Sequence, residues 1–192
     1  VGYWNFNEGT GTTLTDQTSN GNDGTIYGAT WSTDVPPTSG GNNALSFDGT
    51  LDDWVSIDNA VIPSSGDVTV QAWAMAPENS GYKEILAQGD GNACTAYFIG
   101  YTSDGLMRVS CSWQDIEVNY PFGEWVHTTV VKNDNGTKLY LNGELGAETS
   151  STELPSDNTF YIDLLVNNDS NSNNLDNTSN LKNNNYDNNK LN

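Results

Sequence analysis

Positive charge is scarce in this sequence. Only six of the 192 residues are Lys or Arg, against 25 Asp and Glu, so the formal net charge is −19 at pH 7. Nucleic acids and anionic membrane surfaces are bound through clustered basic side chains. The composition therefore argues against nucleic acid and membrane surfaces as partners. It also predicts that sulfated glycans such as heparin bind poorly.

Long apolar runs are missing as well. No stretch approaches the roughly 20 residues that a membrane-spanning helix needs, so we expect no membrane insertion. The sequence begins without Met and shows no signal peptide, so we expect it to be part of a larger, multidomain protein. The acidic composition fits an extracellular location, either secreted or at the cell surface.

Cysteine and histidine are also rare. The two cysteines, Cys94 and Cys111, flank a turn signal at residues 103–105. Folding that hairpin brings them near direct register, which permits a cross-strand disulfide and would indicate an oxidising compartment. Two buried free thiols are the alternative. Since His127 is the one histidine, a zinc site is not expected.

The strongest structural signal lies at residues 124–146, which read EWVHTTVVKNDNGTKLYLNGELG. Runs of β-branched and aromatic residues are separated by turn signals at residues 133–136 and at Asn142-Gly143. Asn-Gly between alternating apolar residues favours a type I′ turn, which needs positive φ at both central positions. The stretch predicts an antiparallel meander whose apolar face packs on a second sheet.

Other strands are expected at short intervals along the chain, and no window has helical periodicity. Residues 14–27 and 32–43 are rich in turn-forming residues and are expected to be loops. This spacing predicts an all-β, two-sheet sandwich. The expected strands outside the meander are residues 3–6, 44–48, 54–57, 67–75, 84–87, 96–101, 106–112 and 160–166.

The C-terminal segment differs in composition from the rest of the chain. Half of residues 167–192 are Asn, and such a segment buries too little apolar surface to offset the entropy lost on ordering. We therefore predict one folded domain at residues 1–166 and a disordered, Asn-rich tail at residues 167–192.

Several segments together resemble one family. Their order and spacing are similar to those of a laminin G-like domain of the concanavalin A-like lectin/glucanase superfamily, over residues 1 to about 163. The segments are GYWNFNEGTG (2–11), LTD (14–16), NGNDG (20–24), LSFDG (45–49), WV (54–55), VTVQAW (68–73), GEWVH (123–127) and LYLNG (139–143).

The resemblance implies a two-sheet antiparallel jelly roll and an extracellular module that binds glycans or proteins, often with a structural calcium ion. A minority of the superfamily are glycoside hydrolases. Family members usually close with a strand reading roughly Ile-Asp-Glu-Val-Arg-Ile-Tyr, paired beside the N-terminal strand. Here Ile162-Asp163 is followed by LLV and the Asn-rich tail. We therefore expect the closing strand to be missing or replaced, which leaves an open sheet edge.

Two loop groups offer the oxygen ligands that calcium prefers. The first precedes the cysteine hairpin and the last strand and matches the rim where laminin-type domains hold calcium. The second lies among the N-terminal motifs. Ordinary turn chemistry is the alternative for both. The first group is Asp90, Asn92 and Asp157, and the second is Asp16, Asn22 and Asp48.

Sugar sites stack apolar sugar faces on exposed aromatic rings and add polar partners. Trp113 is followed by Gln114 and Asp115, and Tyr120 and Tyr101 lie near predicted strand ends. These five residues are the candidate glycan site, with core or edge packing of the rings as the alternative. For the tryptophans inside the family motifs, core packing is the prediction, and these are Trp4, Trp73 and Trp125.

Catalysis has little support in the sequence. The superfamily's retaining hydrolases carry a Glu-x-Asp-x-x-Glu strand motif, and the nearest match here is Asp115-Ile116-Glu117. It sets two carboxylates on one strand face, but the third acid is absent and the order is reversed. His127 has no accompanying Ser or Cys nucleophile pattern. We therefore expect a binding module and no enzymatic activity.

The sequence thus predicts an extracellular, non-catalytic module that binds carbohydrate with the help of calcium. A structural or adhesion module that contacts an extracellular protein is the first alternative. A domain related to glycoside hydrolases, with residual or no activity, is the second.

Overall fold

A computed structural model describes residues 1–37, 40–50, 52–77, 83–89, 97–102, 104–109, 117–152, 154–155 and 160–163. The elements of regular secondary structure assigned within these ranges are all β-strands, and they pair antiparallel in three sheets. No helix in the described part of the chain is long and apolar enough to cross a bilayer.

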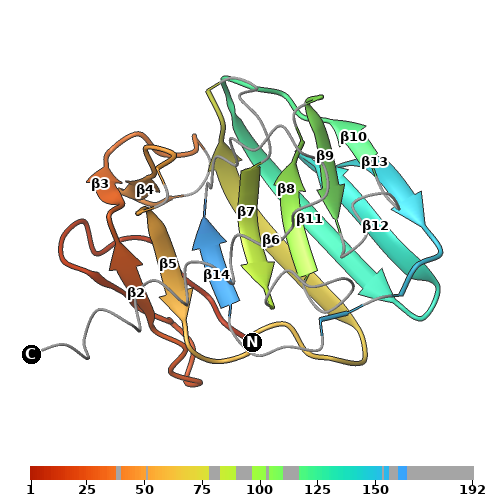
Figure 1. The fold of residues 1–192 in the computed structure, drawn as a ribbon, viewed down its shortest axis with the longest axis horizontal. Coiled ribbons are helices and arrows are strands. Elements are labelled where there is room, and N and C mark those ends of the chain that lie inside the picture. The colour runs from red at the N-terminus through yellow and green to blue at the C-terminus, as the bar shows by residue number, and fades with distance from the viewer. Residues whose placement is uncertain are drawn as a thin grey trace, which may run out of the picture.

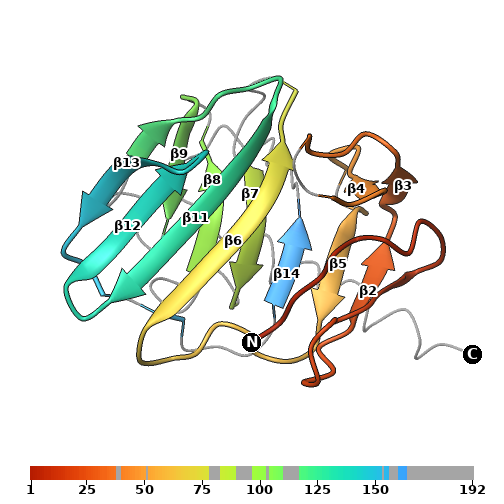
Figure 2. The same cartoon turned by 180° about the vertical axis from the view of Figure 1, so that it is seen from behind.

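The three sheets form a sandwich in which one layer is twice as wide as the other. The two larger sheets face each other, and β14, β5 and β2 of the wider sheet extend beyond β6 (Figures 1 and 2). The eight-stranded sheet has the order β1 (Thr13–Leu14), β2 (Gly24–Tyr27), β5 (Trp54–Ile57), β14 (Phe160–Asp163), β7 (Lys83–Gln88), β8 (Tyr97–Tyr101), β9 (Leu106–Val109) and β10 (Glu117–Asn119). The four-stranded sheet has the order β13 (Glu144–Thr149), β12 (Gly136–Leu141), β11 (Trp125–Asn133) and β6 (Val68–Met75), and β3 (Thr30–Ser32) pairs with β4 (Ala44–Ser46).

The predicted meander is confirmed as β11, β12 and β13. Asn142 and Gly143 join β12 to β13 with φ of 51° and 84°, the two positive values that a type I′ turn requires. Alternation along β11 places Val126 and Val130 in the core, each at most 1% exposed. The all-β sandwich predicted from the spacing of turn signals is therefore the observed fold.

Two apolar clusters fill the space between the layers. The larger lies between the four-stranded sheet and β7, β8 and β9, and the smaller consists of Leu14, Ile26 and Val55. Trp4 and Ile162 pack against both clusters. The Trp4 ring also stacks on Phe160 with centroids 5.8 Å apart, which confirms the predicted core role of Trp4.

The N-terminal segment departs from the sequence prediction. Residues 3–6 were expected to form a strand, but they have no strand assignment, and Phe6 has a φ of 55°. A strand needs a neighbour to pair with, and no described strand pairs with this segment. The expected loop at residues 14–27, by contrast, contains β2, whose Ile26 is 5% exposed.

A buried carboxylate fixes the position of the N-terminal segment. Asp16 Oδ1 accepts hydrogen bonds from the amides of Tyr3 and Thr18 at 3.0 and 2.9 Å. Its Oδ2 accepts hydrogen bonds from the Thr18 hydroxyl and the Asn22 amide at 2.9 and 3.0 Å. Burial by itself raises the pKa of Asp16, but these hydrogen bonds outweigh burial and lower the pKa from 3.8 to about 2.

Two glycines of the meander test its geometry. Their φ values are 127° at Gly136 and 84° at Gly143, a region that costs an alanine about 1–2 kcal/mol. A Cβ at Gly143 meets no atom, whereas at Gly136 it collides with the Thr149 carbonyl oxygen. We expect Gly136→Ala to lower the free energy of unfolding more than Gly143→Ala does. Urea denaturation of both variants measures the difference, and equal losses would contradict the close approach of β12 and β13.

The Asp16 hydrogen bonds predict a pH dependence of stability. The pKa of Asp16 in the folded state lies below its ordinary value of 3.8. Asp16 therefore stabilises the folded state fully above pH 3.8, and this stabilisation is lost as the pH falls towards 2. Asp16→Asn should lower the free energy of unfolding at neutral pH by about 2 kcal/mol. It should also make the free energy of unfolding fall less steeply as the pH drops from 3.8 to about 2. Urea midpoints across the range check both effects. Asp134→Asn, at an exposed turn position, is the control and should leave the loss of stability at acid pH unchanged.

Candidate functional site

An aromatic pair lies on the outer face of the eight-stranded sheet. Tyr27 of β2 and Trp54 of β5 are directly opposite each other in the strand register. Their rings stack with centroids 4.6 Å apart and an angle of 20° between planes. Both point away from the core, because Ile26 and Val55, their neighbours in sequence, belong to the smaller apolar cluster. Tyr27 is 43% exposed.

A tight turn after β2 holds this pair in place. Gly28 has a φ of 64°, and a Cβ there would collide with the Asp53 carboxylate and the Asp52 carbonyl oxygen. Asp53 is 6% exposed, and its Oδ2 accepts a hydrogen bond from the Asp48 amide at 2.8 Å. The glycine therefore lets the end of β2 lie against the start of β5, which brings the two rings together.

Hydroxyl groups lie next to the aromatic pair. Thr25 and Ser56 form the next outward-facing cross-strand pair on β2 and β5. On the other side of β2, β1 pairs only with Gly24 and Thr25. No described strand therefore continues beside Tyr27, whose side chain stays 43% exposed while it stacks on Trp54. The patch combines a ring face with neighbouring hydroxyls, the combination that a sugar ring requires.

A charged row crosses the opposite end of the same face. Glu84, Gly100, Arg108 and Glu117 occupy successive register positions on β7, β8, β9 and β10. Arg108 forms ion pairs with Glu117 at 2.8 Å and with Asp104 at 3.3 Å. Burial raises the pKa of Glu84 to about 8. At this end of the face Glu84 is therefore buried, and Arg108 is held by two carboxylates.

The predicted glycan residues are only partly within the described chain. Trp113, Gln114 and Asp115 lie outside the described residues, between β9 and β10 in sequence. Tyr101 and Tyr120 are 0% and 4% exposed, and their rings stack on each other in the core at 5.1 Å. A ring that is fully buried has no face to offer a sugar, so the structure corrects the prediction for these two tyrosines.

The N-terminal group predicted to bind calcium does not fit a cation at Asp16. A carboxylate has about four acceptor positions, and the hydrogen bonds from Tyr3, Thr18 and Asn22 use all four. The Asn22 side-chain oxygen accepts a hydrogen bond from Asn59, and Asp48 Oδ1 accepts one from the Thr50 amide.

No metal-binding cluster of three or more His, Cys, Asp or Glu side chains occurs in the part of the chain that the structure describes. Asp90, Asn92 and Asp157, the other predicted calcium group, lie outside that part. Cys94 and Cys111 do so as well, although the predicted hairpin between them is present as β8 and β9.

Two tryptophans predicted to lie in the core are on the outer face of the four-stranded sheet. Trp73 of β6 pairs across the sheet with His127 of β11, and their rings are 4.9 Å apart at 38°. The Trp125 indole donates a hydrogen bond to Asp34 at 3.1 Å. Strand alternation explains the correction, because the residues on either side of Trp73, Ala72 and Ala74, face the core.

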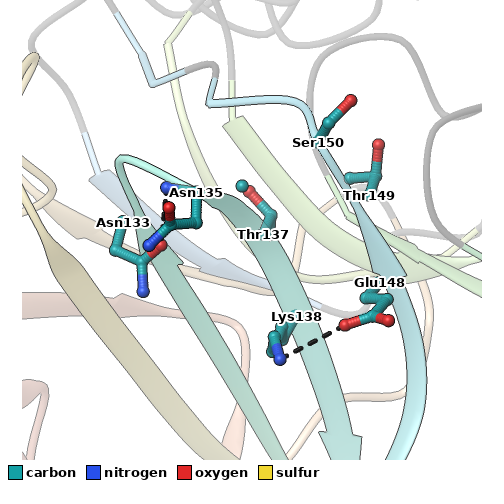
Figure 3. A pocket seen from close by; sticks show the side chains of 8 residues that line it. Asn133, Asn135, Thr137, Lys138, Glu148, Thr149 and Ser150 are labelled. Carbon is teal, nitrogen blue, oxygen red and sulfur yellow. Dashed lines mark hydrogen bonds and ion pairs between the residues drawn. The ribbon is translucent and has the colours of Figure 1, made fainter.

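A hollow of about 440 Å³ lies where β12 meets the end of β13. Figure 3 shows its walls, which include the turn between β11 and β12 and the ion pair of Lys138 with Glu148 at 3.2 Å. The lining is polar and contains no aromatic ring. It lacks the stacking surface that distinguishes the Tyr27 and Trp54 patch.

The aromatic patch was missed from sequence, although a signal for it was present. In WVSI at residues 54–57, Val55 and Ile57 are the apolar pair that faces the core. Strand periodicity then places Trp54 outward. Tyr27 was missed because its stretch, rich in Gly and Asn, was interpreted as a loop.

Comparison with solved structures finds similar folds at low sequence identity. Domain 4 of AbnA, an extracellular arabinanase from Geobacillus stearothermophilus, in complex with arabinotriose, has a TM-score of 0.59 and 15% identity, covering 80% of this chain and 79% of that one. A Trypanosoma rangeli sialidase has a TM-score of 0.60 and 18% identity, covering 88% of this chain and 28% of the sialidase. A botulinum neurotoxin type C structure, which concerns cell entry through two ganglioside molecules, has a TM-score of 0.54 and 16% identity, covering 88% of this chain and 46% of that one. No curated protein matches the sequence.

Comparison of the sequence with models of protein families also finds a match. The model of the concanavalin A-like lectin/glucanases superfamily named Laminin_G_3 matches residues 47–178, more than half of the chain. The antiparallel sandwich agrees with it, as does the meander that the motifs predicted. The chain belongs to the laminin G-like family of the concanavalin A-like lectin/glucanase superfamily.

Proposed function

We propose that this chain is a non-catalytic carbohydrate-binding module that holds its glycan on the outer face of the eight-stranded sheet. The observation that carries the proposal is the stacked pair of Tyr27 and Trp54 on the outer face of the sheet, with Tyr27 43% exposed. Aromatic rings bind the apolar faces of sugars, and nearby polar groups fix the orientation. Thr25 and Ser56 supply hydroxyls on the same strands.

The patch is preorganised for this role. Trp54 supports the Tyr27 ring from behind, so little side-chain freedom remains to be lost when a sugar stacks on it. Gly28 and the buried Asp53 fix the backbone beneath the pair. The net charge of −19 favours neutral glycans over sulfated or otherwise anionic ones.

Similar folds in other proteins support carbohydrate as the ligand class. The AbnA domain was solved in complex with arabinotriose, and the neurotoxin structure concerns ganglioside molecules. The AbnA domain is part of an extracellular enzyme, and this chain covers less than half of the sialidase and of the neurotoxin chain. We therefore extend the proposal to an extracellular module within a larger protein.

The spacing of carboxylates on this face supports binding without catalysis. Glu84 and Glu117 are three strands apart in the sheet, which is roughly 14 Å between their backbones. Glycosidase carboxylates lie about 5–5.5 Å apart for retention and about 6.5–9.5 Å apart for inversion. Glu117 is moreover engaged with Arg108 at 2.8 Å. Neither residue is placed to act with the other on one glycosidic bond.

Tyr27→Ala should abolish most glycan binding. Truncating a central aromatic contact costs about 2 kcal/mol or more, which corresponds to a loss of affinity of roughly 30-fold. The measurement is a glycan array with arabinotriose included, followed by titration calorimetry on the best ligand. Tyr27→Phe keeps the ring and should bind within about threefold of the unaltered chain.

Tyr3→Ala is the matched control, because Tyr3 is 59% exposed but lies outside the patch. Its affinity should match that of the unaltered chain. If Tyr27→Ala binds normally while Trp73→Ala does not, the glycan lies on the four-stranded sheet and our placement is wrong. A chain that binds no glycan at all would favour the adhesion alternative.

Calcium stays a prediction for the group of Asp90, Asn92 and Asp157. An ion that binds only the folded state at 100 times its Kd adds about 2.7 kcal/mol, which raises the Tm of a chain this size by roughly 5–10 °C. Thermal unfolding in calcium and in EDTA measures the shift. The EDTA sample is matched in ionic strength with sodium chloride, because screening alone stabilises so acidic a chain.

Two aspartate variants separate the possible calcium positions. Asp90→Asn should remove the calcium-dependent rise in Tm. Asp16→Asn should lower the Tm in both buffers by the same amount, because the Asp16 oxygens already accept four hydrogen bonds. A calcium effect that Asp90→Asn retains and Asp16→Asn loses would overturn this assignment.

A further inference from the structure

The sequence contains three Asn-Gly pairs, each at a turn or loop of the described chain. They are Asn20-Gly21 before β2, Asn135-Gly136 between β11 and β12, and Asn142-Gly143 between β12 and β13. All three asparagines are exposed, and the glycines that follow them have φ values of 68°, 127° and 84°. The pairs thus share local sequence and exposure, so a difference in their reactivity comes from the contacts of each asparagine.

An asparagine followed by glycine is able to react with its own backbone. The glycine nitrogen attacks Cγ of the asparagine side chain, a C–N bond forms, and the side-chain nitrogen leaves as ammonia with the proton lost by the attacking nitrogen. Water then opens the resulting succinimide ring at one of its two carbonyl groups, which yields aspartate or isoaspartate. Glycine favours the attack because it has no Cβ in the way and its backbone is flexible.

The side chain of Asn142 is held by the neighbouring strand. Asn142 Oδ1 accepts a hydrogen bond from the His127 amide at 2.9 Å. The Asn142 amide in turn donates to the His127 carbonyl oxygen at 2.8 Å. Because His127 belongs to β11, this double contact fixes Asn142 on the sheet. Its Cγ cannot turn towards the Gly143 nitrogen until the side-chain hydrogen bond is broken.

The side chain of Asn20 is held by the N-terminal segment. Asn20 Nδ2 donates a hydrogen bond to the Val1 carbonyl oxygen at 2.8 Å, and the Asn20 amide donates to the Thr18 hydroxyl at 3.2 Å. Breaking one hydrogen bond of ordinary net strength slows a reaction that requires it by about fivefold. Asn20 and Asn142 both carry this penalty.

Asn135 has no such restraint on its side chain. Its backbone amide donates to Asn133 Oδ1 at 2.8 Å, but its carboxamide has no hydrogen-bond partner in the part of the chain that the structure describes. The side chain borders the hollow beside β12, which leaves it room to rotate (Figure 3). Gly136 forms the last pair of the β11–β12 ladder with Asn133, and the end of a ladder opens at low cost.

We propose that Asn135 is a site of spontaneous deamidation and that the fold directs this reaction to Asn135 in preference to Asn20 and Asn142. Water is the co-reactant, ammonia is released, and residue 135 becomes aspartate or isoaspartate. The site lies on the four-stranded sheet, whereas Tyr27 and Trp54 lie on the eight-stranded one. The proposal is therefore independent of glycan binding.

The two products differ in their effect on the hairpin. Isoaspartate adds one carbon atom to the backbone of the turn, whereas aspartate leaves the backbone unchanged and adds one negative charge. Gly136 lies so close to β13 that an added Cβ would collide with the Thr149 carbonyl oxygen. A longer turn displaces Gly136 within this contact, so isoaspartate should lower the Tm more than aspartate does.

The test compares the full chain, folded and unfolded in guanidinium chloride, at the same mildly alkaline pH. Peptide mapping by mass spectrometry gives the rate at which amide becomes acid at each Asn-Gly pair. In the unfolded chain the three rates should be similar, because the reacting sequence is the same. In the folded chain Asn135 should react at least about fivefold faster than Asn20 and Asn142.

Equal rates at the three pairs of the folded chain would overturn the proposal, as would a faster reaction at Asn20 or Asn142. So would an unreacted Asn135 in the folded chain after the unfolded chain has reacted fully. Asn135→Gln is the matched control, because its longer side chain closes the ring far more slowly. It should remove the reaction at residue 135 and leave the rates at Asn20 and Asn142 unchanged.

The consequence for the hairpin is measured on separated products. Isoaspartyl methyltransferase labels isoaspartate and not aspartate, which identifies the two forms. The isoaspartate form should have a lower Tm than the Asn135→Asp variant, which reproduces the aspartate product. An equal Tm would contradict the effect inferred from the close approach of Gly136 to β13.

Discussion

The packing of Trp4 is the contact on which the two layers depend. A four-stranded sheet can cover only part of an eight-stranded one, so the two layers would share a core over half of the wider sheet. Trp4 extends that core, because its ring stacks on Phe160 and touches both apolar clusters. Its indole N–H donates to the Asn22 carbonyl at 2.9 Å, which ties the ring to the loop that Asp16 organises.

This unequal layering explains where the functional features lie. The inner face of β2 and β5 is closed by Trp4, Phe6 and the β3–β4 hairpin, so Ile26 and Val55 are buried without a second full sheet. The outer face of the same two strands is then free to carry Tyr27 and Trp54. Ile162 of β14 lies where the two regions meet, because it packs against both apolar clusters.

Local signals in the sequence were sufficient for the fold and insufficient for the site. Asn142-Gly143 predicts the meander because positive φ is a property of those two residues alone. Residues 3–6 have strand composition but no strand, because pairing depends on a neighbour that a local pattern cannot supply. Trp73 was assigned to the core from its family motif, whereas alternation with Val68 and Val70 already places it outward. The burial of Tyr101 against Tyr120 depends on packing between strands distant in sequence, which no local pattern encodes.

The four Lys and Arg side chains in the part of the chain that the structure describes are all engaged within the fold. Lys132 binds the Gly66 carbonyl, Lys138 pairs with Glu148, Arg108 is held by two carboxylates and Lys83 also has a partner. Because the whole chain has only six Lys and Arg against 25 Asp and Glu, most of its carboxylates take their counter-charge from dissolved ions. The surrounding salt thus acts as a component of this protein's surface. In dilute solution the domain attracts basic partners from a distance but carries its full self-repulsion, and in concentrated salt it gains stability and loses that long-range attraction.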